Sequence, residues 1–98
     1  MAIISFKDKA SEDINYGRIS KRTLKALPSE LHLKARIKFA ILGAATNLND
    51  LISLRGNRLE RLKGNRVGQY SIRINDQYSI CFIWSGTDAH EVEIVDYH

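Results

Sequence analysis

The chain has 98 residues, of which 44% are hydrophobic and 27% charged, proportions typical of one small folded domain, here residues 1–98. No apolar run approaches the roughly 20 residues that a membrane-spanning helix needs, and the net charge of +4 is modest, so we expect no membrane partner. Because Cys81 is the single cysteine and Met1–Phe6 is too short and too soon followed by charge for a signal peptide, we expect a cytoplasmic protein without a disulfide framework.

The N-terminal third is predicted to form one strand and two short helices. The apolar residues 2–6 predict a short strand, because they include a β-branched pair. Residues 8–16 predict one or two helical turns that end at Gly17. Residues 20–27 have helical composition and end before Pro28, which cannot continue a helix.

The longest predicted helix runs from Pro28 to about Ala45. Its apolar stripe has the spacing i, i+4, i+7, i+8, i+11 and consists of Leu33, Ile37, Ala40, Ile41 and Ala44. We expect this stripe to face the core and Lys34 and Lys38 to face solvent. A basic helix face of this kind usually serves solubility, and RNA contact is the alternative.

Positive charge is concentrated between residues 55 and 73, where six basic residues accompany one acid, Glu60. The basic residues are Arg55, Arg58, Arg61, Lys63, Arg66 and Arg73. No Lys or Arg follows Arg73, whereas acids continue to Asp96. The uneven charge predicts a phosphate-binding surface beside an acidic element, or simply two solvated strand faces. The scattered histidines have no zinc-site spacing, so we expect no metal and no cofactor.

Alternation in the last third predicts antiparallel strands. Residues 70–74 and 78–84 alternate around the turn 75–77. Only an odd loop keeps one apolar face intact, so we predict a three-residue loop that pairs Arg73 with Ser79 and leaves Ser71 on the same polar face. A last strand over about 90–97 places Val92 and Ile94 in the core. Arg73 either lines a site or forms a cross-strand ion pair with Glu93.

These elements predict an α+β fold, with the N-terminal strand and the helices packed on one face of a small antiparallel sheet. The other face is expected to be polar and concave.

Two blocks of the sequence resemble the HigB toxins of the RelE superfamily. The first is residues 56–78, which contains the segments Leu62-Lys63-Gly64-Asn65-Arg66 and Ser71-Ile72-Arg73-Ile74-Asn75-Asp76-Gln77. The second is residues 92–98, which ends in Asp96-Tyr97-His98. The set is specific, although each segment alone is a weak indication, and it implies the RelE-like fold.

The resemblance implies an mRNA endonuclease that acts in the decoding site of the ribosome and arrests translation. The ribose 2′-OH attacks the adjacent phosphate without a metal. The implied partners are the ribosome with its mRNA and a HigA-type helix-turn-helix antitoxin, through which the pair contacts operator DNA.

Such a reaction needs a base, an acid and positive charge on the phosphate. The predicted catalytic residues are His98, Arg73, Lys63, Tyr97 and Asp96, with His98 as the proton shuttle. The predicted RNA- and phosphate-binding residues are Arg58, Arg61, Arg66 and Ser79. A solvated tail is the alternative interpretation of His98.

The sequence departs from the family at several positions, of which Asn65 and Ser53-Leu54-Arg55 lie outside the proposed site and two others bear on it. Ser79 stands where a basic residue is common, and Glu60 stands where some relatives have a histidine. Loss of a cation at position 79 weakens transition-state stabilisation by an expected few kcal/mol. The alternative function is therefore a RelE-like module that binds RNA, the ribosome or its antitoxin without cutting.

Overall fold

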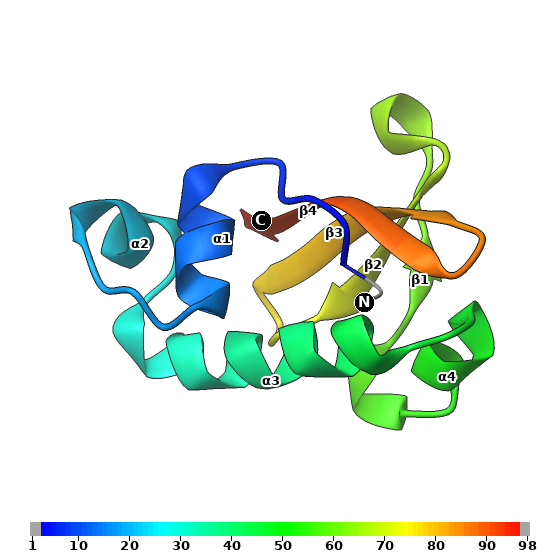
Figure 1. Ribbon diagram of the computed structural model, residues 1–98, viewed down its shortest axis with the longest axis horizontal. Helices are drawn as coiled ribbons and strands as arrows, with labels where there is room; N and C mark the ends of the chain where they lie inside the picture. The colour runs from blue at the N-terminus through cyan, green and yellow to red at the C-terminus, as the bar shows by residue number, and fades with distance from the viewer. Residues whose placement is uncertain (1–2, 97–98) are drawn as a thin grey trace.

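The computed structural model describes residues 3–96, except for the side chain of Arg55. The helices are α1 (Lys9–Asn15), α2 (Lys21–Ala26), α3 (His32–Ala44) and α4 (Leu48–Ile52). The strands are β1 (Glu60–Arg61), β2 (Gln69–Arg73), β3 (Tyr78–Ser85) and β4 (Asp88–Asp96). Short 3₁₀ turns occupy Ser29–Leu31, Arg55–Asn57 and Gly64–Arg66. Figure 1 shows α3 and α1 on one side of the sheet, and thus the predicted α+β arrangement of helices on a small antiparallel sheet is confirmed.

Both predicted short helices are present because each has its own cap. The Asp8 side chain accepts a hydrogen bond from the Ser11 amide at 2.7 Å and starts α1. Gly17, with φ of +75°, takes the left-handed conformation that ends the helix. Ser20 and Thr23 form a reciprocal capping box that starts α2.

Asp13 on α1 gathers three cations and joins α1 to the segment that follows it. Its carboxylate lies 2.9 Å from the Arg18 guanidinium, 3.4 Å from the Lys9 ammonium and 3.7 Å from the Arg22 guanidinium. The hydrogen bond from Arg18 lowers the pKa of Asp13 below its ordinary value of 3.8, against an opposing effect of burial and with further help from Lys9. The carboxylate therefore stabilises the fold in its charged form.

We expect Asp13→Asn to lower the Tm at neutral pH. Because the folded pKa is depressed, the contribution of Asp13 is present above the unfolded pKa and disappears as pH falls through the folded pKa. The Tm difference between wild type and variant should thus shrink to nothing in acid, as thermal unfolding across a pH series will show. Glu30→Gln, at an exposed acid before α3, is the matched control. A Tm difference that persists unchanged in acid would contradict this role.

The helix α3 buries a different face from the predicted one. Its buried residues are Ala35, Lys38, Phe39 and Leu42. Leu33 and Ile37 are instead 65% and 52% exposed, and Lys38, expected in solvent, is only 8% exposed. Apolar residues occur on more than one side of this helix, and the sheet receives the side that bears the bulky Phe39 and Leu42. The predicted stripe was therefore wrong about Leu33 and Ile37, although Ile41 packs against the core and the helix itself is confirmed.

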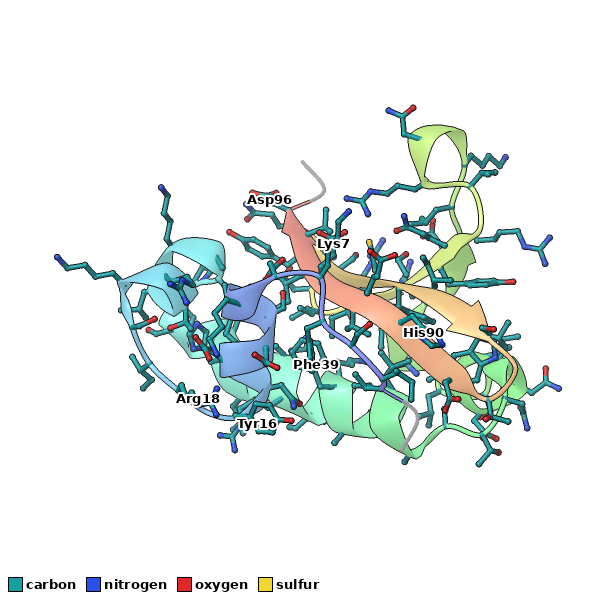
Figure 2. All side chains as sticks on the ribbon, turned by 45° about the horizontal axis from the view of Figure 1, so that its top comes forward. Lys7, Tyr16, Arg18, Phe39, His90 and Asp96 are labelled. Atoms are coloured by element: carbon teal, nitrogen blue, oxygen red, sulfur yellow. The ribbon has the colours of Figure 1, made fainter. Side chains whose placement is uncertain are left out.

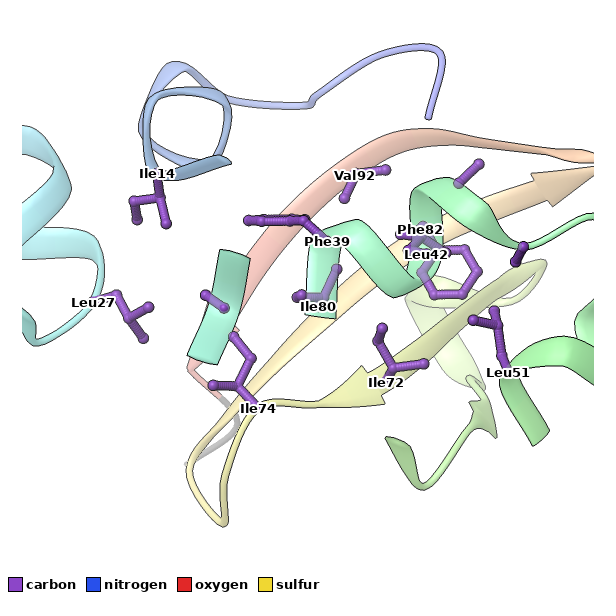
Figure 3. Close-up of a cluster of buried hydrophobic side chains, with 13 residues drawn as sticks. Ile14, Leu27, Phe39, Leu42, Leu51, Ile72, Ile74, Ile80, Phe82 and Val92 are labelled. Carbon is purple, nitrogen blue, oxygen red and sulfur yellow. The ribbon is translucent and has the colours of Figure 1, made fainter. Parts of the chain in front are cut away.

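The core lies between α3 and the sheet. Figure 3 shows Phe39 and Leu42 over the side chains of Ile72, Ile80 and Phe82, all of which are 1% exposed or less. Tyr78 and Trp84 pack against this cluster at its margin. The close packing of the core cluster fixes the sheet against α3, so the opposite face of the sheet has a fixed shape.

The sheet is antiparallel with the order β1-β2-β3-β4. Ile72 pairs with Ile80 and Arg73 with Ser79, which confirms the three-residue loop predicted from parity. The Asn75 side chain closes this loop by accepting hydrogen bonds from the amides of Gln77 at 2.9 Å and Tyr78 at 2.7 Å. On β4, Val92 is buried and Ile94 packs against the core, as predicted.

The predicted N-terminal strand is an extended segment rather than a regular strand. Ile3 and Phe6 form isolated parallel bridges with Ala89 and Val92. The Ile4 amide donates to the Ala89 carbonyl at 2.8 Å, and the segment thereby covers part of the β4 edge. Within residues 3–96, no helix has the length and apolar character needed to cross a membrane.

Candidate active site

The polar face of the sheet contains a cleft of about 170 Å³. Six residues from β1, β2, β3 and the adjoining loops line it: Arg58, Glu60, Ser71, Arg73, Asp76 and Ser79. Strand alternation explains this set, because Ile72 and Ile74 point into the core and their neighbours point away from it. The cross-strand pairs Glu60–Ser71 and Arg73–Ser79 then bring polar side chains together.

Arg73 is held in the cleft by β2 and not by a strong ion pair. Its guanidinium lies 3.5 Å from the carboxylate of Asp76, whose side chain is fully exposed. An exposed pair of this length contributes little, so the guanidinium can exchange this partner for an anion in the cleft. The alternative pairing of Arg73 with Glu93 was wrong. Glu93 instead contacts Arg66 at 3.0 Å and Lys7 at 3.4 Å.

Arg58 enters the cleft from an unusual backbone conformation. Its φ is +44°, in the left-handed region that residues other than glycine seldom adopt. It directly follows the 3₁₀ turn Arg55–Asn57. The sequence placed Arg58 among the phosphate-binding residues, and the structure brings it to the same cleft as Arg73.

Two carboxylates in the cleft were missed as site residues by the sequence reading. Glu60 comes from β1 and Asp76 from the β2–β3 loop. The signal for Glu60 was present, because it is the one acid between Arg55 and Arg73. The cleft therefore combines cations that can hold a phosphate with a group that can accept a proton.

The other predicted basic residues do not line the cleft. Arg61 pairs with Tyr70, and its guanidinium carbon is 5.8 Å from the centroid of the Tyr70 ring. Lys63 is exposed and precedes the turn Gly64–Arg66. Arg66 donates hydrogen bonds at 3.0 Å to both Gln69 and Glu93. Arg61 is the last residue of β1, whereas Lys63 and Arg66 belong to the β1–β2 loop, which projects beyond the sheet in Figure 1.

Ser79 lies in the cleft opposite Arg73, as parity predicted, and is 8% exposed. Its side chain is short, and the cleft has a second serine, Ser71, which pairs with Cys81 two residues further along β3. Both hydroxyls line the cleft and can donate hydrogen bonds to phosphate oxygens. No three His, Cys, Asp or Glu side chains of the described residues lie close enough together to hold a metal ion.

The strand β4 ends at the edge of the sheet where the β2–β3 loop lies. Val95 pairs with Ser79, and the Asp96 carboxylate accepts a hydrogen bond from the Gln77 side chain at 3.1 Å. Figure 2 shows Asp96 at the tip of β4. Asp96 therefore lies close to the cleft without lining it. The predicted Tyr97 and His98 lie outside the described residues.

Comparison with solved structures defines the class of fold. The chain is similar to the YoeB-YefM complex from Staphylococcus aureus, with a TM-score of 0.61, 21% identity and coverage of 98% of this chain and 94% of that one. It is also similar to the YoeB/ParE toxin from Agrobacterium tumefaciens, with a TM-score of 0.52, 16% identity and coverage of 98% and 94%. At these identities the likeness establishes the fold, which is that of the RelE-like toxins.

Sequence comparison then gives the family. Residues 5–98 match the model of HigB-like toxins, described as RelE-like toxins of the type II toxin-antitoxin system HigB. Toxin HigB-1 of Vibrio cholerae serotype O1 is 40% identical over 81 residues, which are 83% of this chain and 82% of that protein. The chain belongs to the HigB-like toxin family, which confirms the resemblance found in the sequence.

Proposed function

We propose that this toxin is a metal-independent endoribonuclease that cuts mRNA in the decoding site of the ribosome. The ribose 2′-OH loses its proton and attacks the adjacent phosphorus. The bond to the 5′ oxygen breaks and this oxygen takes up a proton, so the products are a 2′,3′-cyclic phosphate and a 5′-hydroxyl. The observation that carries the proposal is the cleft in which Arg58, Glu60 and Arg73 meet.

Each cleft residue has a role suited to its chemistry. The Arg58 and Arg73 guanidinia bind phosphate oxygens and stabilise the negative charge that grows on the phosphorane. Glu60 accepts the proton of the 2′-OH, because it is a carboxylate in the same cleft as the cations that hold the phosphate. Ser71 and Ser79 donate hydrogen bonds to the phosphate.

The C-terminal residues complete the reaction. His98 supplies the proton to the 5′ oxygen, Asp96 orients it and Tyr97 stacks on a base of the mRNA. The position of Asp96 beside the β2–β3 loop supports this assignment, because the last strand ends near the cleft. The roles of His98 and Tyr97 rest on the family motif.

The projecting β1–β2 loop binds the ribosome. Lys63 and Val67 are exposed on it, and the exposed Arg61 lies at the end of β1 where the loop begins. Cations on a protruding loop attract the phosphate backbone of ribosomal RNA without reading its sequence. Lys63 is thus assigned here to RNA binding, since it does not line the cleft.

Binding without cleavage is the second candidate function, and Ser79 is the observation that favours it. Ser79 lines the cleft without adding a positive charge, at a position where the family resemblance implies a basic residue. Inhibition by binding alone predicts translation arrest that does not depend on His98 or Glu60.

Mapping of transcript ends after induced expression separates the two functions. Cleavage predicts new mRNA ends that are confined to translated frames and vanish when the start codon of a reporter is removed. Growth arrest without new ends would reject the endonuclease and leave the binding function.

The proposed antitoxin is of the HigA type, and operator DNA is bound only through it. The outward face of α3 is a suitable docking surface because it carries the exposed Leu33, Ile37 and Ala40. The exposed cations Lys34 and Arg36 flank this stripe, so the partner segment should combine apolar and acidic side chains.

We expect Ile37→Asp to weaken binding of the antitoxin about tenfold or more, since it places a charge in an apolar contact. Toxicity of the variant alone should remain, because α3 lies on the side of the sheet opposite the cleft. Ile52→Asp on α4, at a residue that is 60% exposed, is the control. Titration of purified antitoxin and co-expression will measure both effects. Equal neutralisation of the two variants would place the antitoxin elsewhere.

A further inference from the structure

Lys38 is a buried lysine that no ion pair explains. It lies on α3 and is 8% exposed, and its ammonium donates a hydrogen bond at 2.9 Å to the Asn57 side-chain oxygen. No carboxylate forms an ion pair with it among the described residues. Lysine is rarely buried without a charged partner because its desolvation is unfavourable. A buried ammonium that binds a neutral amide therefore calls for a reason beyond stability.

Asn57, the partner of Lys38, is buried and forms hydrogen bonds through its side chain and its backbone. It is 0% exposed, its side-chain amide donates to the Leu51 carbonyl at 3.1 Å, and its backbone amide donates to the Leu54 carbonyl at 3.0 Å. The Lys38 ammonium also lies against the backbone of Gly56, where an added β-carbon would be 3.5 Å from the nitrogen. The turn Arg55–Asn57 is thus fixed to both α3 and the end of α4.

The residue after Asn57 is Arg58, which lines the cleft and has a left-handed backbone conformation. Such a conformation costs of order 1–3 kcal/mol and persists only where the surrounding contacts determine it. Asn57 directly precedes Arg58 in the chain, and its side chain is hydrogen-bonded to Lys38 and Leu51. These hydrogen bonds fix the point from which the Arg58 side chain departs.

We propose that Lys38 and Asn57 form a buried support that positions Arg58 in the cleft. The two are positioning residues for the reaction proposed above, on which this inference rests, and they act through Arg58 without contact with RNA. Burial lowers the pKa of the Lys38 ammonium and the charge of Lys34 lowers it further, so the molecule keeps a costly group at this place.

The test is a cycle of four proteins: wild type, Lys38→Met, Arg58→Ala and the double variant. Cleavage rates are measured on ribosomes programmed with mRNA. We expect Lys38→Met to lower the rate about ten- to a hundred-fold, because a small misplacement of a binding group has an effect of this size. In the Arg58→Ala background the same substitution should change nothing, since the group that it positions is already absent. An equal loss in both backgrounds would overturn the proposal.

Two further variants separate positioning from folding. Lys25→Met changes an exposed lysine on α2 and should leave the rate unchanged. Lys38→Met combined with Asn57→Leu replaces both polar partners by apolar ones, which restores much of the lost stability. Its rate should stay low although its Tm recovers. A rate that recovers together with the Tm would show that Lys38 serves stability alone.

The NMR signal of the Arg58 side-chain Nε–H gives a readout that does not depend on activity. We expect it to shift or broaden in Lys38→Met and to remain in place in Lys25→Met. If the wild type cuts no RNA, the proposed function fails, and this signal still decides whether the support exists. An Arg58 signal that is identical in wild type and Lys38→Met would refute the support.

Discussion

We expect Arg73→Ala to lower the rate of mRNA cleavage about a hundred- to a thousand-fold, the effect of removing one group that stabilises a charged transition state. Arg73 projects from the rigid strand β2 into the cleft, and its planar guanidinium suits two phosphate oxygens at once. The fold should be unaffected, because the ion pair with the exposed Asp76 is weak. Rates on programmed ribosomes and a Tm measurement will check both expectations.

Arg22→Ala is the matched control for Arg73→Ala. Arg22 is also exposed and forms an ion pair of similar length, 3.7 Å to Asp13, but it lies on α2. The control should cut at the rate of the wild type. If Arg73→Ala also cuts at that rate, the cleft is not the place where the phosphate is held.

The second large effect is expected for Glu60→Gln, which keeps the shape of the side chain and removes its basicity. In its proposed role as the base for the 2′-OH, Glu60 is expected to contribute about a hundred-fold or more to kcat. Loss of its negative charge should at the same time leave KM unchanged or lower it, because the cleft then attracts RNA more strongly.

This division between kcat and KM distinguishes catalysis from simple repulsion. If Glu60 only repels RNA, Glu60→Gln will raise the rate and toxicity. A variant that cuts at least as fast as the wild type would therefore contradict the assignment of Glu60 as the base. Ser79→Arg provides the reverse comparison, since it adds a cation to the same cleft beside Arg73.

The sequence predicts the polar face of the sheet well because strand geometry is local. Parity alone placed Arg73 opposite Ser79, and the register confirms it. The same periodicity separates Glu60 from its neighbour Arg61, since adjacent strand residues point to opposite faces. That separation was not predicted, because β1 has only two residues and no alternating pattern marks it.

Other features depend on contacts between distant parts of the chain. The buried face of α3 is selected by how the sheet receives Phe39 and Leu42, so an apolar stripe elsewhere on the helix gave the wrong answer. The burial of Lys38 depends on Asn57, which is 19 residues away. No local pattern shows this contact, and none shows the left-handed conformation of Arg58.

The most direct test of the central claim is the chemistry of the new RNA ends after mRNA is incubated with ribosomes and this toxin. The control is the same reaction without the toxin. We expect fragments that end in a 2′,3′-cyclic phosphate and begin with a 5′-hydroxyl, formed by the wild type and lost in Arg73→Ala. Intact mRNA on arrested ribosomes, or fragments that Arg73→Ala produces equally well, would contradict the account of the cleft.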